Sequence, residues 1–379
     1  MARSIKVIVQ RGSSNGRAME REGSRRGGWR FPCIFALHIP AAPLLMPNPP
    51  VSLVTGGAGF IGAHVAKELL ALGHRVVVLD DLSGGFQDQV DPRALFIQGS
   101  ITDDALVERL FAEHRFTYVY HLAAYAAEGL SHFIRRFNYT NNLIGSVNLI
   151  NASVRHGVKC FVFTSSIAVY GALKPPMRED MRPVPEDPYG VAKYAVEMDL
   201  YAAKHMFGLD YVVFRPHNVY GEYQNLGDRY RNVVGIFMNQ LMQGKPLTIF
   251  GDGTQQRAFT YVGDIAPVIA RSATTHAAFG EIFNIGADKP YTVNELATLV
   301  MEAMGLKGEV KHLEARNEVA FAFSDHSKVA RIFGAQPETG LGEGLRRMAP
   351  WAKATGARQS TAFGNIEVVR NLPPSWLNP

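Results

Sequence analysis

Short apolar runs alternate with stretches of helical spacing along much of the chain. Residues 51–55 form an apolar run that ends in glycines, as a buried parallel strand does, and residues 60–72 have helical spacing up to Gly73. The same alternation predicts further strands at 75–79, 94–98, 118–122, 160–164 and 210–214, and helices at 103–114, 137–156 and 189–207. This order predicts an α/β fold with a doubly wound parallel sheet and helices on both faces.

The pattern loosens after residue 217. Helical spacing returns over 230–244, 265–275, 293–304 and 324–333, and we expect Asp264 to cap the second of these helices and Asn294 to lie near the start of the third. We therefore expect a smaller C-terminal α/β domain. The predicted parts are a basic, disordered extension (1–50), a first domain (51–217, with 258–288 returning to it), a second domain (218–257 and 289–349) and a loosely attached tail (350–379).

The positive charge of the chain lies at its N-terminal end. The net charge is +5, but residues 1–46 alone carry +6, so the remainder is close to neutral. We expect no nucleic-acid partner for this body. No apolar run reaches the roughly 18–20 residues that span a bilayer, so we expect no membrane partner either. Two cysteines, Cys33 and Cys160, favour a reducing, cytoplasmic compartment over a disulfide framework.

The basic N-terminal stretch has two interpretations. It is a targeting peptide or basic arm, or it is an upstream extension with Met46 as the true start. We favour the second, and the charged stretch is too long for the first part of a secretory signal.

Three glycines between the first strand and the first helix predict a phosphate-binding loop. Gly56, Gly59 and Gly62 lack a Cβ, so the backbone can approach a pyrophosphate, and the helix N-terminus offers free N–H groups. Asp80, at the end of the next strand, is placed to accept hydrogen bonds from the adenosine ribose and would repel a 2′-phosphate. We therefore predict NAD, rather than NADP, as the cofactor. The alternative is a plain tight turn beside a surface aspartate.

Tyr189 and Lys193 are candidate catalytic residues. They are four residues apart and share one face of a predicted helix. A phenol is a weak base at pH 7, and a neighbouring ammonium, together with the positive nicotinamide ring, lowers its pKa. Ser166, after the strand at 160–164, could hydrogen-bond both a substrate oxygen and the tyrosine. Each feature alone is also explained by a surface pair or a turn residue.

Ordered motifs over residues 51–335 resemble those of the extended short-chain dehydrogenase/reductases, in particular the nucleotide-sugar epimerases. The motifs are TGGAGFIG (55–62), Leu79-Asp80-Asp81, His121-Leu122-Ala123-Ala124, Tyr139-Thr140-Asn141-Asn142, SSIAVYG (165–171), the Tyr189/Lys193 pair, Arg215-Pro216-His217-Asn218-Val219-Tyr220-Gly221 and Gln256-Arg257-Ala258-Phe259-Thr260-Tyr261-Val262. The resemblance implies a Rossmann-like domain, a bound NAD that is recycled, and a homodimer. It also implies epimerisation of a nucleotide sugar, with C4 of UDP-glucose and UDP-galactose as the first choice.

The resemblance also assigns positions along the cleft. The cofactor positions are Gly56, Gly59, Phe60, Ile61, Gly62, Asp80, Ser100, Ile101, Leu122, Ala123, Ala124, Asn142, Tyr189, Lys193 and Pro216. The substrate positions are Ser166, Asn218, Asn232, Val233, Arg257 and Arg316. Two arginines suit a diphosphate, because guanidinium binds oxyanions in bidentate fashion. We expect no metal site. The chain departs from the family pattern at Ser100, where an aspartate is usual.

The residues after Ser166 bear on the reaction. Related dehydratases carry an acid–base pair there, whereas Ile167 and Ala168 cannot move a proton, which favours epimerisation. A small residue near Ala322 would leave room for an N-acetyl group, although Phe321 or Phe323 could occupy that place. The alternatives are therefore a UDP-N-acetylhexosamine or UDP-glucuronate 4-epimerase, or a nucleotide-sugar dehydratase or reductase. A non-catalytic NAD-binding regulator is the alternative of another class.

Overall fold

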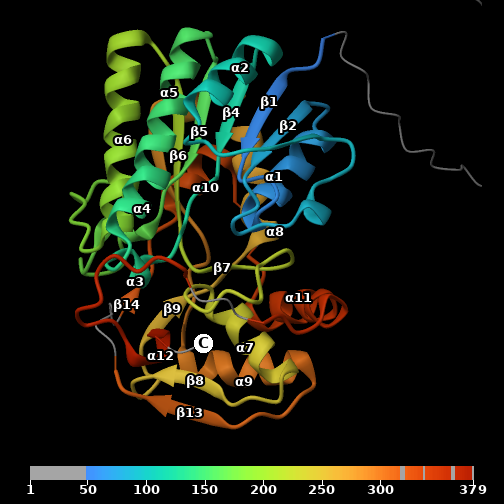
Figure 1. Ribbon diagram of the computed structural model, residues 1–379, viewed down its shortest axis with the longest axis vertical. Coiled ribbons are helices and arrows are strands. Elements are labelled where there is room, and N and C mark those ends of the chain that lie inside the picture. Colours follow the sequence, from blue (N-terminus) through green and yellow to red (C-terminus); the bar gives the residue numbers. More distant parts are fainter. Residues whose placement is uncertain (1–47, 316–320, 336–337, 360–362, 378–379) are drawn as a thin grey trace, which may run out of the picture. The chain divides into compact units, whose positions relative to one another are not determined.

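The computed structural model describes residues 48–377 except for 316–320, 336–337 and 360–362. Its centre is a seven-stranded parallel sheet with the strand order β11-β6-β5-β4-β1-β2-β3 (Figure 1). The strands are β1 (Val51–Thr55), β2 (Arg75–Asp80), β3 (Leu95–Gln98), β4 (Tyr118–His121), β5 (Cys160–Thr164), β6 (Tyr211–Pro216) and β11 (Glu281–Ile285). The predicted doubly wound parallel sheet is confirmed. The seventh strand, β11, was not predicted, and it pairs with β6.

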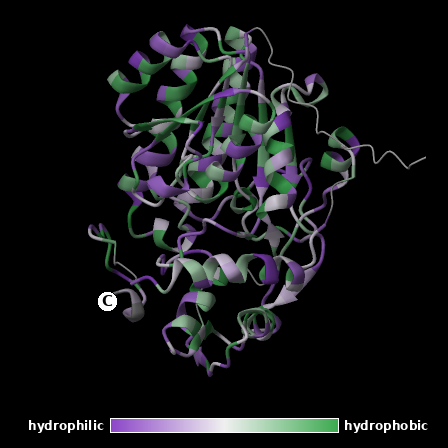
Figure 2. Ribbon diagram, turned by 90° about the vertical axis from the view of Figure 1, so that its right-hand side faces the viewer, coloured by the Kyte–Doolittle hydropathy of each residue, from purple (hydrophilic) through white to green (hydrophobic). Residues whose placement is uncertain are grey.

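Helices cover both faces of this sheet because its strands are apolar on both sides. One face packs against α1 (Phe60–Ala71) and α8 (Val262–Ser272). The other packs against α2 (Asp104–His114), α5 (Gly145–Arg155) and α6 (Pro188–Phe207). Figure 2 shows the hydrophobic colouring concentrated in the strands between these helices. The order in which strands are added to the sheet changes direction between β1 and β4, and ligands bind at this point in sheets of this kind.

Helix α6 begins and ends at residues typical of helix termini. The Asp187 carboxylate accepts a hydrogen bond from the N–H of Gly190 at 2.9 Å, and Pro188 occupies the first helical position. Gly208, with φ of 74°, ends the helix in the left-handed conformation. The helix predicted at 137–156 is also present, as α4 (Arg135–Tyr139), a π-helical turn (Thr140–Ile144) and α5.

A second cluster of elements lies beyond the carboxyl ends of the sheet strands. Its core packs α7 (Val233–Met242), α9 (Val293–Met304) and α11 (Leu341–Thr355) beside β8 (Leu247–Phe250), which pairs with β13 (Val310–Leu313). The smaller elements are α3 (Glu128–Ser131), α10 (Ser327–Phe333), α12 (Pro374–Leu377), β7 (Val219–Tyr220), β9 (Gln256–Ala258), β10 (Thr260–Tyr261), β12 (Pro290–Thr292) and β14 (Phe321–Ala322). Residues 45–379 form one compact unit, and their division into a cofactor domain and a substrate domain stays a prediction.

One predicted helix cap is wrong. Asp264 lies inside the first turn of α8, where its carboxylate accepts hydrogen bonds from the backbone and hydroxyl of Thr339 instead of capping the helix. Helix α9 is capped by Thr292, which forms a capping box with Glu295, and Asn294 lies at the start of this helix, as predicted.

The predicted loose tail is also corrected. Residues 350–355 complete α11, and Ala352 is buried there against the second cluster. Leu372 and Trp376 are buried farther along, so apolar packing attaches this segment to the body. The predictions for residues 1–47 concern a stretch outside the described residues. In the described part of the chain, no helix is long and apolar enough to cross a membrane.

Candidate active site

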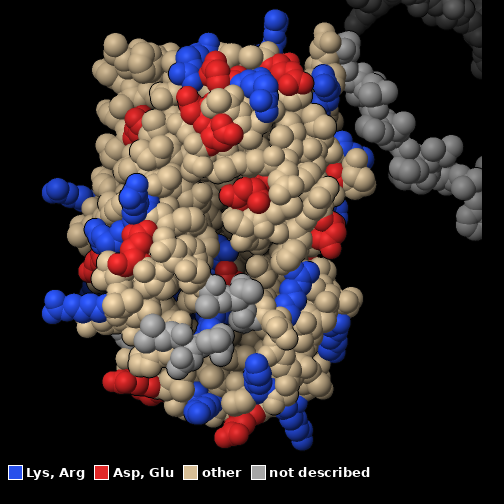
Figure 3. All heavy atoms as spheres, viewed as in Figure 1, with Lys and Arg blue, Asp and Glu red and all other residues tan. Residues whose placement is uncertain are grey.

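One cavity of about 2460 Å³ lies at the carboxyl ends of the sheet strands, and its mouth is visible as a dark hollow in the middle of Figure 3. Segments that follow β1, β2, β4, β5 and β6 line one side, and α7, β8 and β9 line the other. The cavity brings together most of the residues predicted from sequence. These are Gly56, Gly59, Phe60, Ile61, Gly62, Asp80, Ser100, Ile101, Leu122, Ala123, Ala124, Ser166, Tyr189, Lys193, Pro216, Asn218, Asn232, Val233 and Arg257.

One predicted residue that the structure describes is not among those that line it. Asn142 is buried behind the wall, where its side-chain oxygen accepts from the N–H of Tyr125 at 2.8 Å and its amide donates to the Tyr125 carbonyl at 3.1 Å. It therefore supports the loop that follows β4 rather than facing the cavity. Arg316 lies outside the described residues.

The glycine loop has no room for side chains. Gly56 has φ of 71°, and a Cβ there would lie 2.7 Å from the backbone nitrogen of Ala123. A Cβ on Gly62 would lie 2.0 Å from the carbonyl oxygen of Gly56. Helix α1 begins at Phe60, and its N-cap residue, Gly59, offers no side chain to the N–H groups of the first turn. This cradle fits the pyrophosphate of a dinucleotide.

Asp80 ties the end of β2 to the glycine loop. Its Oδ2 accepts from the N–H of Ala58 at 3.0 Å, and its Oδ1 accepts from the N–H of Leu82 at 2.8 Å. Burial raises the pKa of Asp80, and both backbone hydrogen bonds oppose that rise by favouring the carboxylate. The carboxylate lies beside the loop, where a ribose 2′-phosphate would meet like charge, so the residues present fit NAD.

Tyr189 and Ser166 meet at the floor of the cavity. Ser166 Oγ accepts from the N–H of Ala168 at 3.1 Å, so the hydroxyl proton is left for another partner, and the Ser166 side chain is near enough to the Tyr189 phenol to influence its pKa. Burial raises the pKa of Tyr189, and the Ser166 contact lowers it by favouring the phenolate. Burial is the largest influence on this pKa, and the lowering expected from Lys193 together with the nicotinamide ring stays a prediction.

Lys193 is held close to the tyrosine by the backbone of β5. Its Nζ donates to the carbonyl oxygen of Thr164 at 2.8 Å and lies 5.8 Å from the centre of the Tyr189 ring. Burial lowers the pKa of Lys193 to about 7, and the Glu197 carboxylate acts in the opposite direction. The ammonium is therefore positioned to act on the phenol and on a ligand hydroxyl beside it.

A buried ion pair behind this site was missed from sequence. Glu197 accepts from the Ser165 hydroxyl at 2.5 Å and from Arg215 at 3.0 and 2.5 Å. Arg215 also donates to the Tyr170 hydroxyl at 2.7 Å. The sequence did indicate that Glu197 lies close to Lys193, since the two residues are four apart and so share one face of the helix. This network joins β5, β6 and α6 directly beneath the catalytic candidates.

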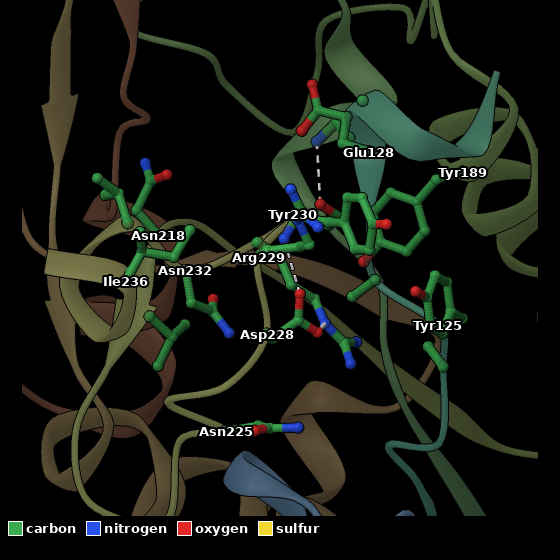
Figure 4. A pocket seen from close by; sticks show the side chains of 18 of the residues that line it. Tyr125, Glu128, Tyr189, Asn218, Asn225, Asp228, Arg229, Tyr230, Asn232 and Ile236 are labelled. Atoms are coloured by element: carbon green, nitrogen blue, oxygen red, sulfur yellow. Dashed lines mark hydrogen bonds and ion pairs between the residues drawn. The ribbon is translucent and has the colours of Figure 1, made fainter. Parts of the chain in front are cut away.

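The cavity is also lined by aromatic and charged side chains that were not predicted from the sequence, among them Tyr125, Asp228 and Arg231. Figure 4 shows Tyr125, Glu128 and Tyr189 on one side and Asn218, Asn232 and Ile236 on the other. Arg231 donates to Asp228 at 2.5 Å, and its guanidinium lies 4.9 Å from the centre of the Tyr125 ring. Tyr125, Asp228 and Arg231 come from loops, where hydrophobic periodicity gives no signal.

The predicted substrate residues come from both sides of the cavity: Ser166 and Asn218 follow strands β5 and β6, whereas Val233 lies on α7 and Arg257 on β9. Asn218 and Asn232 both adopt the left-handed conformation, with φ of 40° and 64°, and Asn232 directly precedes α7. Arg257 lies on β9, where Ala322 of β14 is its partner in the strand register. Ala322 and Phe321 line the cavity, whereas Phe323 is not among its lining residues. A cation, two amides and a small residue therefore face the same space.

Comparison with known proteins identifies the family. The model of the NAD dependent epimerase/dehydratase family matches residues 52–286. The structure of UDP-glucose 4-epimerase with UDP-glucose from Thermotoga maritima is 37% identical and has a TM-score of 0.76, covering 80% of this chain and 99% of that one. UDP-glucuronate 4-epimerase of Thermodesulfobacterium geofontis is 31% identical over 84% of this chain and 98% of its own length.

A third relative widens the range of substrates. UDP-N-acetylglucosamine 4-epimerase from Methanobrevibacter ruminantium is 29% identical with a TM-score of 0.76, covering 82% of this chain and all of that one. The glycine cradle, the tyrosine–lysine pair and these matches point to one conclusion. The chain belongs to the NAD-dependent epimerase/dehydratase family, as an extended short-chain dehydrogenase/reductase of the nucleotide-sugar epimerase type that uses NAD.

Proposed function

We propose that this enzyme interconverts UDP-glucose and UDP-galactose by epimerisation at C4. The observation that carries the proposal is the meeting of Ser166, Tyr189 and Lys193 in one cavity with the glycine loop and Arg257. Proton transfer, cofactor binding and diphosphate binding are thereby available within one site. The relatives that act on UDP-sugars at C4 support the same reaction.

Tyr189 is the proposed acid–base group. Its phenolate takes the proton of the sugar 4-hydroxyl, and the phenol returns that proton after the sugar has turned. Ser166 hydrogen-bonds the reacting oxygen and the phenol, and Lys193 stabilises the phenolate electrostatically. NAD, when bound, supplies the two-electron oxidant for C4 and restores the hydrogen to its opposite face. The residues around the sugar must therefore hold the nucleotide firmly and the sugar loosely.

Positions 167 and 168 argue against water elimination. Ile167 and Ala168 both line the cavity directly after Ser166, and neither side chain can donate or accept a proton. A dehydratase with its acid–base pair at these positions is therefore disfavoured, and a reaction that needs only the tyrosine is favoured.

The identity of the sugar has two close alternatives. Ala322 is small and faces the cavity beside Arg257, which favours acceptance of a UDP-N-acetylhexosamine in addition to the unsubstituted sugar. UDP-glucuronate is supported by the Thermodesulfobacterium geofontis relative. A panel of UDP-, dTDP-, GDP- and CDP-sugars, with products separated by chromatography, tests all three. We expect UDP-galactose from UDP-glucose, and no conversion of any nucleotide sugar would refute the proposal.

We further propose a homodimer formed through α6. Val191, Met198 and Tyr201 lie at spacings of seven and three residues on this helix and are 39%, 47% and 60% exposed. Apolar side chains at this spacing form a stripe that a second copy of the helix could cover. Tyr201→Glu should shift the protein from dimer towards monomer, as measured by sedimentation equilibrium. An unchanged molecular mass would argue for another interface.

A further inference from the structure

Residues 357–359 and 363–377, which follow α11, contact both sides of the cavity. In Figure 1 this red segment leaves α11 on the right, reaches the region beside α3 on the left and ends at α12. We call it the clasp; the structure describes its residues 357–359 and 363–377. Ala357, Arg358, Gln359, Val368 and Trp376 are among the residues that line the cavity.

The first end of the clasp is fixed to the substrate side. The backbone N–H of Arg358 donates to the side-chain oxygen of Asn239 in α7 at 2.9 Å. The amides of Asn239 and Gln243 both donate to the Arg358 carbonyl, each at 2.9 Å. The same arginine reaches the cofactor side, because its guanidinium lies 3.7 Å from the centre of the Phe86 ring. Phe86 in turn donates its N–H to the carbonyl of Ala58 in the glycine loop.

The far end is fixed to the helices that follow β4. The Glu367 carboxylate accepts from the N–H groups of Arg136 and Phe137, at 2.7 and 2.9 Å, at the first turn of α4. A carboxylate is favoured at this end of a helix by the dipole and by the unpaired N–H groups. Leu372 and Trp376 are buried in one apolar cluster with Leu130 and neighbouring residues, which adds non-polar attachment.

Between its ends the clasp touches the sugar end of the cavity. The N–H of Phe363 donates to the Tyr230 hydroxyl at 3.0 Å, and its ring centre lies 5.3 Å from that of Tyr125. The rings of Tyr230 and Trp376 meet edge to face at 5.2 Å. Tyr125, Tyr230 and Trp376 line the cavity together with Tyr189, so the clasp forms part of the wall around the reacting sugar.

The clasp lies in the part of the chain beyond the family match. The comparison with the Thermotoga maritima enzyme covers 99% of that chain but only 80% of this one, which leaves one fifth of this chain unmatched. Residues 1–47 are fewer than that unmatched fifth. Part of residues 48–379 therefore has no counterpart there. The family model ends at residue 286, well before the clasp.

We propose that residues 357–359 and 363–377 hold the two sides of the cleft together over the ligands, and that release of this clasp limits how fast nucleotide and NAD leave. The proposal rests on the proposed function for the nucleotide, whereas NAD is the cofactor of the family. A sugar that must turn while loosely held gains from enclosure, because the keto intermediate cannot then escape. Since the clasp binds both sides, the cleft cannot widen at this edge until one end is released.

Dissociation rates of bound ligands test the clasp. The variants are Glu367→Ala, which removes both hydrogen bonds to α4, and a chain that ends after Gly356. Glu343→Ala is the matched control, because it removes an exposed glutamate in α11 that pairs with Arg347 outside the clasp. The measurements are the stopped-flow dissociation rate of uridine diphosphate and the NAD that remains bound after repeated gel filtration. Circular dichroism and thermal unfolding establish that each variant is folded.

We expect Glu367→Ala to release uridine diphosphate about tenfold faster, equivalent to about 1.4 kcal/mol, and to retain less NAD. The shortened chain should show a larger effect, and Glu343→Ala should match the parent. Unchanged release of both ligands from a folded Glu367→Ala would overturn the proposal, whether or not the shortened chain folds. Neither measurement needs turnover. If the parent protein converts no nucleotide sugar but Glu367→Ala still releases NAD faster than the parent, the proposed reaction is refuted and the clasp is supported.

Discussion

The hydroxyl of Ser165 donates a 2.5 Å hydrogen bond to the carboxylate of Glu197 in the interior of the protein. Both side chains are almost fully buried. Ser165 precedes the candidate Ser166, and Glu197 lies one helical turn after Lys193. The contact therefore fixes the end of β5 against α6, and with it the relative positions of the serine, tyrosine and lysine of the site.

Removal of the Glu197 charge should destabilise the fold. In Glu197→Gln, the buried Arg215 guanidinium loses its counter-charge, and breaking a buried pair in this way costs about 3–5 kcal/mol. Urea unfolding at pH 7 measures the free energy of unfolding. Glu343→Gln, which breaks an exposed pair, should change it by less than about 1 kcal/mol. Equal effects of the two substitutions would mean that burial of the pair does not matter.

Tyr189→Phe should abolish most turnover and leave cofactor binding intact. Loss of a positioned acid–base group lowers the rate by about 10²–10⁴-fold. The ring remains, so NAD should still copurify, as its absorbance after denaturation would report. Tyr194→Phe is the control on the same helix, because Tyr194 packs against the cluster of Val169, Tyr170 and Met177 and is not among the residues that line the cavity. Turnover that survives in Tyr189→Phe would assign the proton transfer to another group.

Patterns that depend on neighbours in sequence were predicted well. The strand at 51–55, the glycine turn and the helix from Pro188 each follow from spacing, caps and conformational limits within a few residues. The tyrosine–lysine pair needed only helical spacing and the order of motifs. These features are local, so one sequence carries enough information to place them.

Features that depend on distant residues were missed. Strand β11 becomes a sheet strand only because β6 offers its edge, and Asp264 leaves its capping role because Thr339 lies near it. Glu367 contacts Arg136 across more than 200 residues, and its surroundings in sequence are polar and rich in proline. No periodicity signals such contacts, which is why the clasp was predicted to be a loose tail.

Stability should rise with pH between 7 and 9, and Lys193 should cause part of that rise. Burial lowers the pKa of Lys193 to about 7, whereas the unfolded chain titrates near its ordinary value. In this window the unfolded state binds more protons than the native state, so the free energy of unfolding increases with pH. Lys193→Met should remove about 2 kcal/mol of this increase. Parallel pH profiles for the two proteins would contradict the lowered pKa.

Asp80→Asn should weaken NAD binding by about 10–100-fold. An amide cannot accept from both Ala58 and Leu82 while it keeps an acceptor for a ribose hydroxyl, so one hydrogen bond is lost. Fluorescence titration with NAD measures the change. Asp81→Asn is the neighbouring control, since Asp81 is exposed and accepts only from Ser83 among the contacts of its loop. Stronger binding of NAD by Asp80→Asn would remove the ribose role of this carboxylate.

Ala322→Tyr should separate the candidate substrates. Ala322 lies opposite Arg257 in the strand register and faces the cavity, so a phenol there reduces the space beside the diphosphate site. An N-acetyl group needs that space and a hydroxyl does not. We expect kcat/KM for UDP-N-acetylglucosamine to fall at least about tenfold more than kcat/KM for UDP-glucose, since steric rejection of one group is worth 1–3 kcal/mol. Ala322→Gly is the control and should spare both activities. If Ala322→Tyr lowers kcat/KM equally for both nucleotide sugars, position 322 controls access to the site rather than the choice of sugar.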